Sequence, residues 1–389
     1  MIRVGFVLID YDKDWLGGAN YISNLLHAIE KVANRQIEPV LIVPPATSAK
    51  LLEKLPSWQV LRTVLVNRHH LSWYYGRKFT KRVLGRDFLL ENFLRKNCID
   101  VLSHSGSLGR NAKLPTIGWI PDFQHRRMPE FFQPKDVAER DQDYRRSSQQ
   151  CDLLLLSSVD AQNDLADFNP DALDSSRVLH FVSGFAGSAP ASIDETILRD
   201  RYEITGPYFH LPNQFWAHKN HRLVIDALAL LKAQGSDALV ICTGLTKDHR
   251  WPNYFQELMT YATAKGVTDS FRVLGRVPYE DLMGLMIHSV AIINPSLFEG
   301  WSTTVEEAKS LGLNIVLSDI PVHREQNPDR GTYFDPKSAT DLADVLESVL
   351  KKSSGETGLC NIQLNEHLSK RFSKFGTKYQ ELVLELVSR

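Results

Sequence analysis

Short apolar runs alternate with stretches of helical periodicity along the whole chain. Runs such as 153–156 and 290–293 contain only apolar residues and show no polar residue at alternate positions. Continuous apolar runs of this length are typical of strands that are buried on both faces of a parallel sheet. Because such strands alternate with helical patterns, the chain is predicted to form βαβ units and an α/β fold.

The predicted elements fall into two successive series. The first series has strands at 3–9, 39–43, 101–104, 116–120, 153–156 and 178–182, and helices at 19–32, 88–96, 135–149 and 158–168. The second has strands at 208–211, 238–242, 271–274, 290–294 and 314–317, and helices at 221–233, 253–265, 279–288, 303–311 and 340–350. A last helix is predicted at 374–387.

The stretch 183–192 separates the two series and is rich in Gly, Ala, Ser and Pro, which is typical of a linker. A chain of 389 residues is long enough for two domains. We therefore predict a first Rossmann-like domain at 1–185, a linker at 186–204 and a second Rossmann-like domain at 205–373.

Composition narrows the class of protein. The net charge of −1 gives no sign of a nucleic-acid partner. The four cysteines are scattered without a Cys-x-x-Cys pair, which predicts neither a zinc site nor a disulfide framework and fits a reducing cytoplasm. The apolar run at the N-terminus is too short for a signal peptide, and no run reaches the roughly 20 residues that span a bilayer. A cytoplasmic location is therefore expected.

The most informative stretch of the sequence is 296–312. Glu299 follows the predicted strand 290–294, and Glu307 lies eight positions further on, inside the next predicted helix. Small hydroxyl residues lie between the two acids. Backbone N–H groups at the start of a helix can hold a diphosphate, and free carboxylates accept hydrogen bonds from sugar hydroxyls.

A second candidate site follows the first predicted strand. Gly17 and Gly18 allow the backbone to come close to a phosphate or a sugar at the start of a helix. An ordinary turn between strand and helix is the alternative. The spacing is not Gly-x-Gly-x-x-Gly, so a dinucleotide cofactor is disfavoured.

The third candidate site follows the predicted strand 116–120. Asp122 is placed to orient or deprotonate an acceptor hydroxyl, or to hydrogen-bond a donor sugar. His125 lies three positions further on and is a candidate catalytic residue, with an ordinary core histidine as the alternative.

The fourth candidate site opens the first helix of the second series. Lys219 stands at that helix start, where the helix dipole disfavours a cation that has no anionic ligand. A lysine there suits a diphosphate leaving group. Three polar residues on the same stretch, Asn213, Gln214 and His218, are further candidates for donor binding.

Together these motifs resemble the retaining glycosyltransferases of family GT4, which have the GT-B fold. The run from Glu299 to Ala308 is similar to the Glu-x7-Glu motif of that family, and the Gly-Gly and Lys-Asn blocks match in the same order. Two positions depart from the pattern. Pro121 stands where many relatives carry a histidine, and the arginine that usually precedes the Lys-Asn block is missing.

The resemblance implies two Rossmann-like doubly wound domains that face a central cleft, with the C-terminal helix 374–389 crossing back to the first domain. It implies an enzyme that moves a sugar from a nucleotide-diphosphate sugar to a hydroxyl of a saccharide or lipid-linked acceptor, with retention of the anomeric configuration. The nucleotide sugar is a co-substrate, and neither a metal nor a resident cofactor is implied. Assembly of bacterial polysaccharide or lipopolysaccharide is the expected setting.

The resemblance also assigns site residues. Glu307 would hold the ribose of the donor, the backbone at 301–304 its diphosphate, and Glu299 its sugar, whereas Glu306 would be a solvated helix residue. The catalytic residues implied are Asp122, His125, Lys219 and Glu299. The donor-binding residues implied are Gly17, Gly18, Asn213, Gln214, His218, Lys219, Thr243, Gly244, Val277, Glu299, Gly300, Trp301, Ser302, Thr303, Thr304 and Glu307.

One segment, 67–86, is left unexplained by this fold. It carries six Lys or Arg residues and three consecutive aromatic residues but no acidic residue. This composition suits contact with an anionic membrane at the inner face of the cytoplasmic membrane, and a solvated helix with a packed aromatic face is the alternative. Two other interpretations of the whole chain also remain. One is a catalytically silent protein that binds nucleotide sugars, and the other is a GT-B epimerase or phosphorylase.

Overall fold

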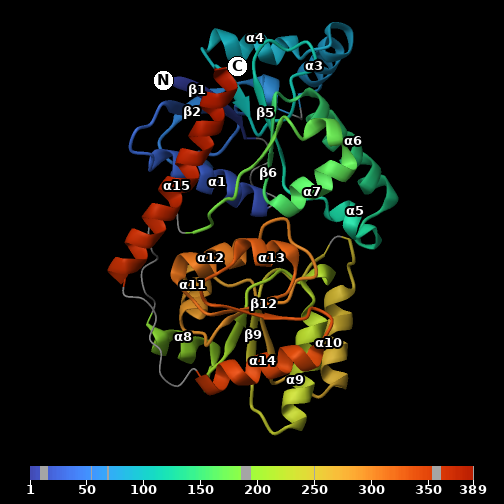
Figure 1. Cartoon of the computed structure of the whole chain (residues 1–389), viewed down its shortest axis with the longest axis vertical. Helices are drawn as coiled ribbons and strands as arrows, with labels where there is room; N and C mark the ends of the chain where they lie inside the picture. The colour runs from blue at the N-terminus through green and yellow to red at the C-terminus, as the bar shows by residue number, and fades with distance from the viewer. Residues whose placement is uncertain are drawn as a thin grey trace. The chain divides into compact units, whose positions relative to one another are not determined.

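The chain folds into two compact units. The computed structural model describes residues 1–8, 16–53, 55–67, 70–184, 194–248, 250–352 and 361–388. The first domain consists of 1–126, 134–182 and 369–389, and the second consists of 127–133 and 183–368 (Figure 1). Each contains one parallel sheet, so the prediction of two Rossmann-like α/β domains is confirmed.

The first domain is built on a seven-stranded sheet in the order β3-β2-β1-β4-β5-β6-β7. Its strands are β1 (Ile2–Val7), β2 (Ile37–Val43), β3 (Gln59–Arg62), β4 (Val101–Ser103), β5 (Thr116–Ile120), β6 (Leu153–Leu156) and β7 (Ser176–Val178). All four leucines of β6 are buried, as expected for a strand that is covered on both faces.

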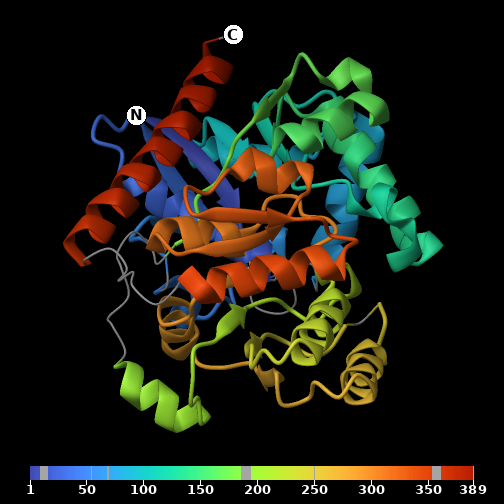
Figure 2. The same ribbon diagram turned by 60° about the horizontal axis from the view of Figure 1, so that its bottom comes forward.

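The helices of the first half of the chain are α1 (Leu16–Glu30), α2 (Ala49–Leu52), α3 (Leu71–Leu84), α4 (Phe88–Lys96), α5 (Gln124–Arg127), α6 (Pro134–Gln150) and α7 (Val159–Phe168). The last helix, α15 (Asn361–Val387), runs beside α1 in both views (Figures 1 and 2). A Cβ atom at Gly376 would collide with the carbonyl oxygen of Ala28, so the absence of a side chain permits this close packing.

The second domain is built on a six-stranded sheet in the order β10-β9-β8-β11-β12-β13. Its strands are β8 (Phe209–Leu211), β9 (Val240–Thr243), β10 (Phe271–Gly275), β11 (Ile292–Asn294), β12 (Ile315–Ser318) and β13 (Gly331–Phe334). Its helices are α8 (Glu195–Tyr202), α9 (His221–Ala233), α10 (Tyr254–Ala264), α11 (Tyr279–Ile287), α12 (Thr303–Leu311), α13 (Pro321–Gln326) and α14 (Ala339–Lys352).

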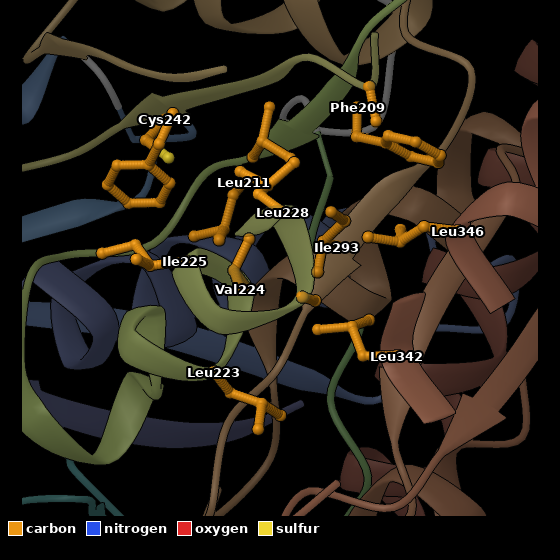
Figure 3. Close-up of a cluster of buried hydrophobic side chains, with 14 of the residues drawn as sticks. Phe209, Leu211, Leu223, Val224, Ile225, Leu228, Cys242, Ile293, Leu342 and Leu346 are labelled. Atoms are coloured by element: carbon orange, nitrogen blue, oxygen red, sulfur yellow. The ribbon is translucent and has the colours of Figure 1, made fainter. Parts of the chain in front are cut away.

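One hydrophobic core of the second domain lies between its sheet and the helices α9, α10 and α14 (Figure 3). Leu211 and Ile293 from the sheet meet Val224 and Leu228 of α9 and Leu342 of α14, and all five side chains are almost fully buried. Helices α11, α12 and α13 lie over the opposite face of the sheet (Figure 1). This packing fixes the strand ends from which the functional loops emerge.

Both sheets share one topology, in which the chain first winds outward in one direction and then restarts beside the first strand. In the second domain the reversal lies between β8 and β11, and in the first domain it lies between β1 and β4. Ligands of open α/β sheets bind outside the carboxyl ends of the strands at this point. The loops after β8 and β11 are therefore the first place to look for a site.

The structure differs from the predicted elements in several places. Strands β3 and β13 and helices α2, α5, α8 and α13 were not predicted, and α3 was expected only as the alternative for 67–86. Strand β7 lies at 176–178 rather than 178–182. The predicted linker 186–204 contains α8, while its residues 186–193 lie outside the described residues. The last helix begins at 361 rather than 374. In the described part of the chain, no helix is both long enough and apolar enough to cross a membrane.

Candidate functional site

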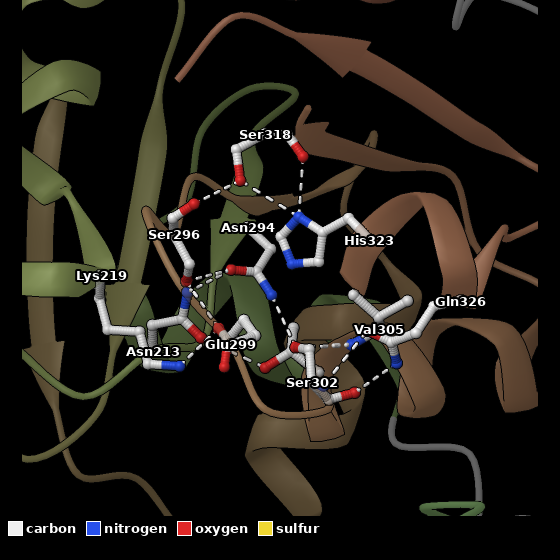
Figure 4. Close-up of polar contacts among 11 residues, drawn as sticks. Asn213, Lys219, Asn294, Ser296, Glu299, Ser302, Val305, Ser318, His323 and Gln326 are labelled. Carbon is white, nitrogen blue, oxygen red and sulfur yellow. Dashed lines mark hydrogen bonds and ion pairs between the residues drawn. The ribbon is translucent and has the colours of Figure 1, made fainter. Parts of the chain in front are cut away.

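Three polar side chains meet where the second sheet reverses (Figure 4). Asn213 follows β8 and donates from Nδ2 to Oδ1 of Asn294, at the end of β11, over 3.2 Å. Ser296 donates to the same Asn294 oxygen over 2.7 Å, and its hydroxyl also lies 2.6 Å from Glu299. The side chains of Asn213, Asn294 and Ser296 are all buried, so this network fixes the course of the loop that carries Glu299.

Lys219 and Glu299 form an ion pair beside this network. The lysine Nζ lies 2.6 Å from Oε1 of Glu299, and the two side chains are only 15% and 10% exposed. Burial alone would raise the pKa of Glu299, but the charge of Lys219, together with its hydrogen bond and that of Ser296, outweighs burial and lowers it. The carboxylate is therefore ionised at neutral pH.

Helix α12 begins directly after this loop. Ser302 caps it by accepting a hydrogen bond from Val305 N, and Gln326 of α13 binds both the N–H and the carbonyl of Ser302. Trp301, Ser302 and Thr304 are buried, and Thr303 is half-buried. The helix start is thus held rigidly, as an anion site made of backbone N–H groups requires.

Glu306 is not the solvated residue that the sequence suggested. Its side chain is 2% exposed and accepts a hydrogen bond from Nε2 of Gln326 over 3.0 Å. Lys309 lies 3.5 Å from the same carboxylate. Glu306 is therefore part of the support beneath the helix start, and this expectation was wrong.

Glu307, one position further on, is half-buried on another side of α12. Ser183 donates to its Oε1 over 3.3 Å, and Ser310 anchors Ser183 in turn by donating to its carbonyl. Burial raises the pKa of Glu307 to about 7, while the Ser183 hydrogen bond opposes that rise. A carboxyl group with this pKa changes its charge near neutral pH.

His323 of α13 was missed by sequence reasoning and lies next to the loop of Ser296 (Figure 4). Its Nδ1 lies 2.9 Å from the carbonyl oxygen of Ser318, whose hydroxyl donates to the carbonyl of Ser296. The ring is fully buried, and burial lowers its pKa to about 4, so it is neutral. The spacing of residues in the sequence does not predict the contact of His323 with Ser318, because this contact depends on α13, which was not predicted.

Several predicted donor-binding residues have structural roles instead. Thr243 is buried and bonded to His210 over 2.9 Å, which turns its hydroxyl inward. Gly244, at φ 146°, packs against the backbone of Asn213, where any side chain would collide. Val277 packs against the cluster of Tyr208 and Leu285. A direct contact of Thr243 with a nucleotide is therefore not supported.

His218, another predicted donor-binding residue, is buried and carries no charge at neutral pH. The ring is 4% exposed, and burial, followed by the nearby charges of Lys219 and Arg250, lowers its pKa well below the usual value. A neutral ring adds no positive charge to the site. Gln214, four positions before His218, and Gly300, next to Glu299, are both half-buried.

In the first domain, the structure places His125 in a buried cluster. The ring is completely buried and lies 3.0 Å from Asp141 of α6, between Phe123 and Tyr144. Asp122, in contrast, is half-buried at the carboxyl end of β5 and accepts the N–H of Gln124 over 2.9 Å.

The other predicted features of the first domain lie as follows. Gly17 and Gly18 belong to the first turn of α1, three residues earlier than the predicted helix start, and the preceding residues 9–15 lie outside the described part. The segment 67–86 contains the whole of α3, and two of its residues, 68 and 69, lie outside the described part.

Residues 199–373 match the family described as "Glycosyl transferases group 1". Two curated proteins are similar over shorter stretches. A GDP-mannose:cellobiosyl-diphosphopolyprenol alpha-mannosyltransferase of Komagataeibacter xylinus is 30% identical over 38% of this chain and 37% of its own length. The gpi3 subunit of the phosphatidylinositol N-acetylglucosaminyltransferase of Schizosaccharomyces pombe is 32% identical over 21% of this chain and 18% of its own length.

Solved structures resemble the chain over its whole length. HepE of Anabaena in complex with UDP-glucose has a TM-score of 0.65 and 15% identity, with 100% of each chain covered. At this level of identity the likeness shows the fold alone, which is the GT-B fold of two Rossmann-like domains.

Proposed function

We propose, from the premise that the second domain of this chain belongs to the glycosyl transferases group 1 family, that the protein transfers a sugar from a nucleotide-diphosphate sugar to an acceptor hydroxyl. The observation that carries the proposal is the Lys219–Glu299 pair beside the capped start of α12. A fixed cation, backbone N–H groups at a helix start and an ionised carboxylate are groups that suit a diphosphate sugar.

Each group has a role in this proposal. An ammonium carries three N–H donors, so Lys219 can keep its bond to Glu299 and still donate to a phosphate oxygen. Glu299 accepts hydrogen bonds from hydroxyls of the donor sugar. Glu307 accepts hydrogen bonds from the hydroxyls of the donor ribose, and Ser183 holds the Glu307 carboxylate in position.

The proposed reaction retains the anomeric configuration, following the resemblance to family GT4. The bond between the anomeric carbon and the phosphate oxygen breaks, and the acceptor oxygen bonds to the same face of that carbon. The acceptor proton passes to the departing diphosphate. Lys219 and the α12 N–H groups stabilise the negative charge that develops on the diphosphate. Asp122 orients the acceptor hydroxyl. No metal ion is needed in this scheme, so chelator-treated protein should keep its activity.

The first test is binding. Melting temperatures are measured with UDP, GDP, ADP, TDP and CDP and their common sugars, for the wild type, Lys219→Ala and Glu307→Ala. An exposed lysine, Lys247→Ala, is the matched control. One nucleotide should raise the melting temperature of the wild type and of the control, and its effect should shrink in the two site variants. If no nucleotide binds the folded wild type, the proposal fails.

Transfer is tested next, with the radiolabelled form of the sugar nucleotide that binds and a set of saccharide and lipid-linked acceptors. Product that forms only when an acceptor is present supports a transferase. If NMR shows that the transferred sugar has the same anomeric configuration in the product as in the donor, the transferase is a retaining one. Donor binding without turnover on any acceptor would indicate a silent binding protein. Conversion of the donor to an isomer without acceptor would indicate an epimerase, and dependence on inorganic phosphate would indicate a phosphorylase.

We also propose that the protein acts on a lipid-linked or polysaccharide acceptor at an anionic membrane surface, in the assembly of a bacterial glycoconjugate. The supporting feature is α3. Tyr75, Phe79 and Val83 recur on one face of this helix and are each at least 60% exposed, and Lys78 and Arg82 are exposed beside them. Aromatic and apolar side chains flanked by cations suit the headgroup region of anionic lipids.

Sedimentation with vesicles tests this surface. Wild-type protein should sediment with vesicles that contain phosphatidylglycerol and not with vesicles of phosphatidylcholine alone. Lys78→Glu combined with Arg82→Glu should abolish this binding, whereas Lys135→Glu combined with Lys370→Glu, at exposed positions elsewhere, should retain it. Equal binding of both double variants would contradict the proposed surface.

A further inference from the structure

A short segment from the first half of the sequence belongs to the second domain. Residues 127–133, here called the clasp, pack with 183–368, although the chain before and after them belongs to the first domain. The clasp contains the 3₁₀ turn Pro129–Phe131 and lies between α5 and α6. The clasp includes the sequence Pro-Glu-Phe-Phe at 129–132, and the proposed reaction gives it no role.

Two contacts seat the clasp on buried rings of the second domain. The guanidinium of Arg127 lies 5.7 Å from the ring centre of Phe298, a distance at which a cation is attracted to an aromatic face. The ring of Phe131 lies 6.5 Å from that of His218, at an angle of 48°. Phe298 is 7% exposed and His218 is 4% exposed, so both seats are firmly held.

The two rings that the clasp contacts are sequence neighbours of the Lys219–Glu299 ion pair. Phe298 directly precedes Glu299, and His218 directly precedes Lys219. The two loops are also joined directly, because the N–H of Leu297 donates to the carbonyl of His218 over 2.8 Å. The clasp therefore contacts both loops within one residue of the two groups proposed to bind the donor.

A third contact fixes the far end of the clasp. The guanidinium of Arg250 lies 5.3 Å from the ring centre of Phe132 and 4.7 Å from that of Trp216. Asp248, which is buried, holds Arg250 at 3.1 Å. A small pocket is enclosed by these groups and lined by Glu130, Phe131, Phe132, Gln133, Ala217, Asp248, Arg250 and Trp251.

We propose that the clasp positions the Lys219–Glu299 pair, with Arg127 and Phe131 as its positioning residues. Arg127 holds the loop of Glu299 through Phe298, and Phe131 holds the loop of Lys219 through His218. Without these contacts, the two loops remain joined by the Leu297 amide, the Asn213–Asn294 hydrogen bond and the ion pair itself. The relevance of the clasp to donor binding rests on the function proposed above.

The first test needs no ligand. Hydrogen exchange of the Leu297 amide is followed by mass spectrometry or NMR in the wild type, in Arg127→Ala/Phe131→Ala and in the control Glu130→Ala/Gln133→Ala. The control removes two exposed polar side chains of the same segment. We expect exchange at Leu297 to be about tenfold faster in the first variant and unchanged in the control. Equal exchange in all three proteins would overturn the positioning role.

The second test measures donor binding and turnover. With the sugar nucleotide that binds the wild type, we expect the Kd and the donor KM of Arg127→Ala/Phe131→Ala to rise about five- to tenfold, while the acceptor KM stays unchanged. Arg127→Lys/Phe131→Tyr keeps a cation and a ring, and should restore most of the affinity. Donor binding within twofold of the wild type in the alanine variant would contradict the inference.

The two tests separate failure of the inference from failure of the proposed function. If the wild type binds no sugar nucleotide but Leu297 exchange still responds to the clasp variants, the proposed function is wrong and the clasp still holds the two loops. If the wild type binds a donor and neither readout responds, the clasp has no positioning role. Melting temperatures of all variants show whether the second domain remains folded.

Discussion

Lys219 and Glu299 lie 80 positions apart in the chain, and their side chains meet at 2.6 Å. The contact brings together the loop after β8 and the loop after β11. These two strands are neighbours at the point where the strand order of the second sheet reverses. A buried carboxylate without a cation would be costly, so Lys219 keeps Glu299 ionised and the ion pair holds both side chains in place. A change to either side chain should therefore alter both stability and ligand binding.

Replacing Lys219 should weaken binding of a nucleoside diphosphate at least about tenfold, because one charge-assisted contact to phosphate is lost. Lys219→Ala also leaves Glu299 buried without its cation, so the free energy of unfolding should fall by about 3 kcal/mol. Calorimetric titration and urea unfolding measure the two effects. Lys219→Arg should lose less of both, and Lys247→Ala should lose neither. Unchanged affinity in Lys219→Ala would remove the lysine from the site.

Glu307 should make stability depend on pH in a defined direction. Its pKa is raised from 4.5 to about 7 in the folded protein, so the fold favours the protonated form. The resulting stabilisation is fully present below pH 4.5 and is lost as the pH rises through 7. Glu307→Gln removes this loss, and its melting temperature should exceed that of the wild type at about pH 8 by more than at about pH 5.

The same group should make donor binding depend on pH. An ionised carboxylate accepts hydrogen bonds from ribose hydroxyls more strongly than a neutral acid does. Affinity for the nucleotide should therefore increase from about pH 6 to about pH 8, a range that extends about one pH unit on either side of the pKa. Glu307→Gln should bind less tightly at the upper end of that range and should show a flat profile across it. A wild-type affinity that does not change with pH would contradict the role of Glu307.

His125 and Asp122 should separate in their effects. His125→Asn breaks a buried contact with Asp141, so the free energy of unfolding should fall by about 1–3 kcal/mol while kcat of the folded protein changes little. Asp122→Asn should lower kcat about 100-fold or more with little loss of stability, if the carboxylate orients the acceptor hydroxyl. Steady-state kinetics and urea unfolding give kcat and the free energy of unfolding for each variant. A large loss of kcat in His125→Asn with little change in Asp122→Asn would instead favour His125 as the catalytic residue.

Gly376→Ala tests the attachment of α15. The added methyl group would collide with the carbonyl of Ala28 and with Val32, and backbone atoms cannot move aside as a flexible side chain can. We expect a loss of about 1–3 kcal/mol in the free energy of unfolding, measured with urea, and no change in nucleotide affinity. Gly206→Ala, where an added Cβ meets open space, is the control. Equal stability of the two variants would mean that α15 does not pack on α1 in this way.

The strands with long buried runs were predicted well from the sequence, because a continuous apolar stretch such as β6, bounded by polar residues and too short for a helix, is typical of a buried strand. Strands β3 and β13 were missed. They are four residues long, mostly not buried, and lie at the edges of their sheets. Edge strands are short and mixed in polarity, and little in their pattern distinguishes them from a loop.

The same limit applies to the candidate site. Lys219 and Glu299 could be predicted because a charged residue after a strand end is conspicuous. Gln326 and His323 could not, because they act through α13, a six-residue helix that begins at a proline and has no periodic signal of its own. The burial of Glu306 was missed for the same reason, since its partner Gln326 comes from that helix.

The clasp has a consequence for protein engineering and for the ancestry of such chains. The second domain is assembled from two pieces of sequence, 127–133 and 183–368, so a cut at residue 183 does not release it whole. A chimaera that joins the first half of this chain to the second half of a relative would seat a foreign clasp on the loops of Lys219 and Glu299. Exchange of halves should therefore succeed only when residues 127–133 travel with the second domain, which makes this heptapeptide part of the module that would be inherited or transplanted.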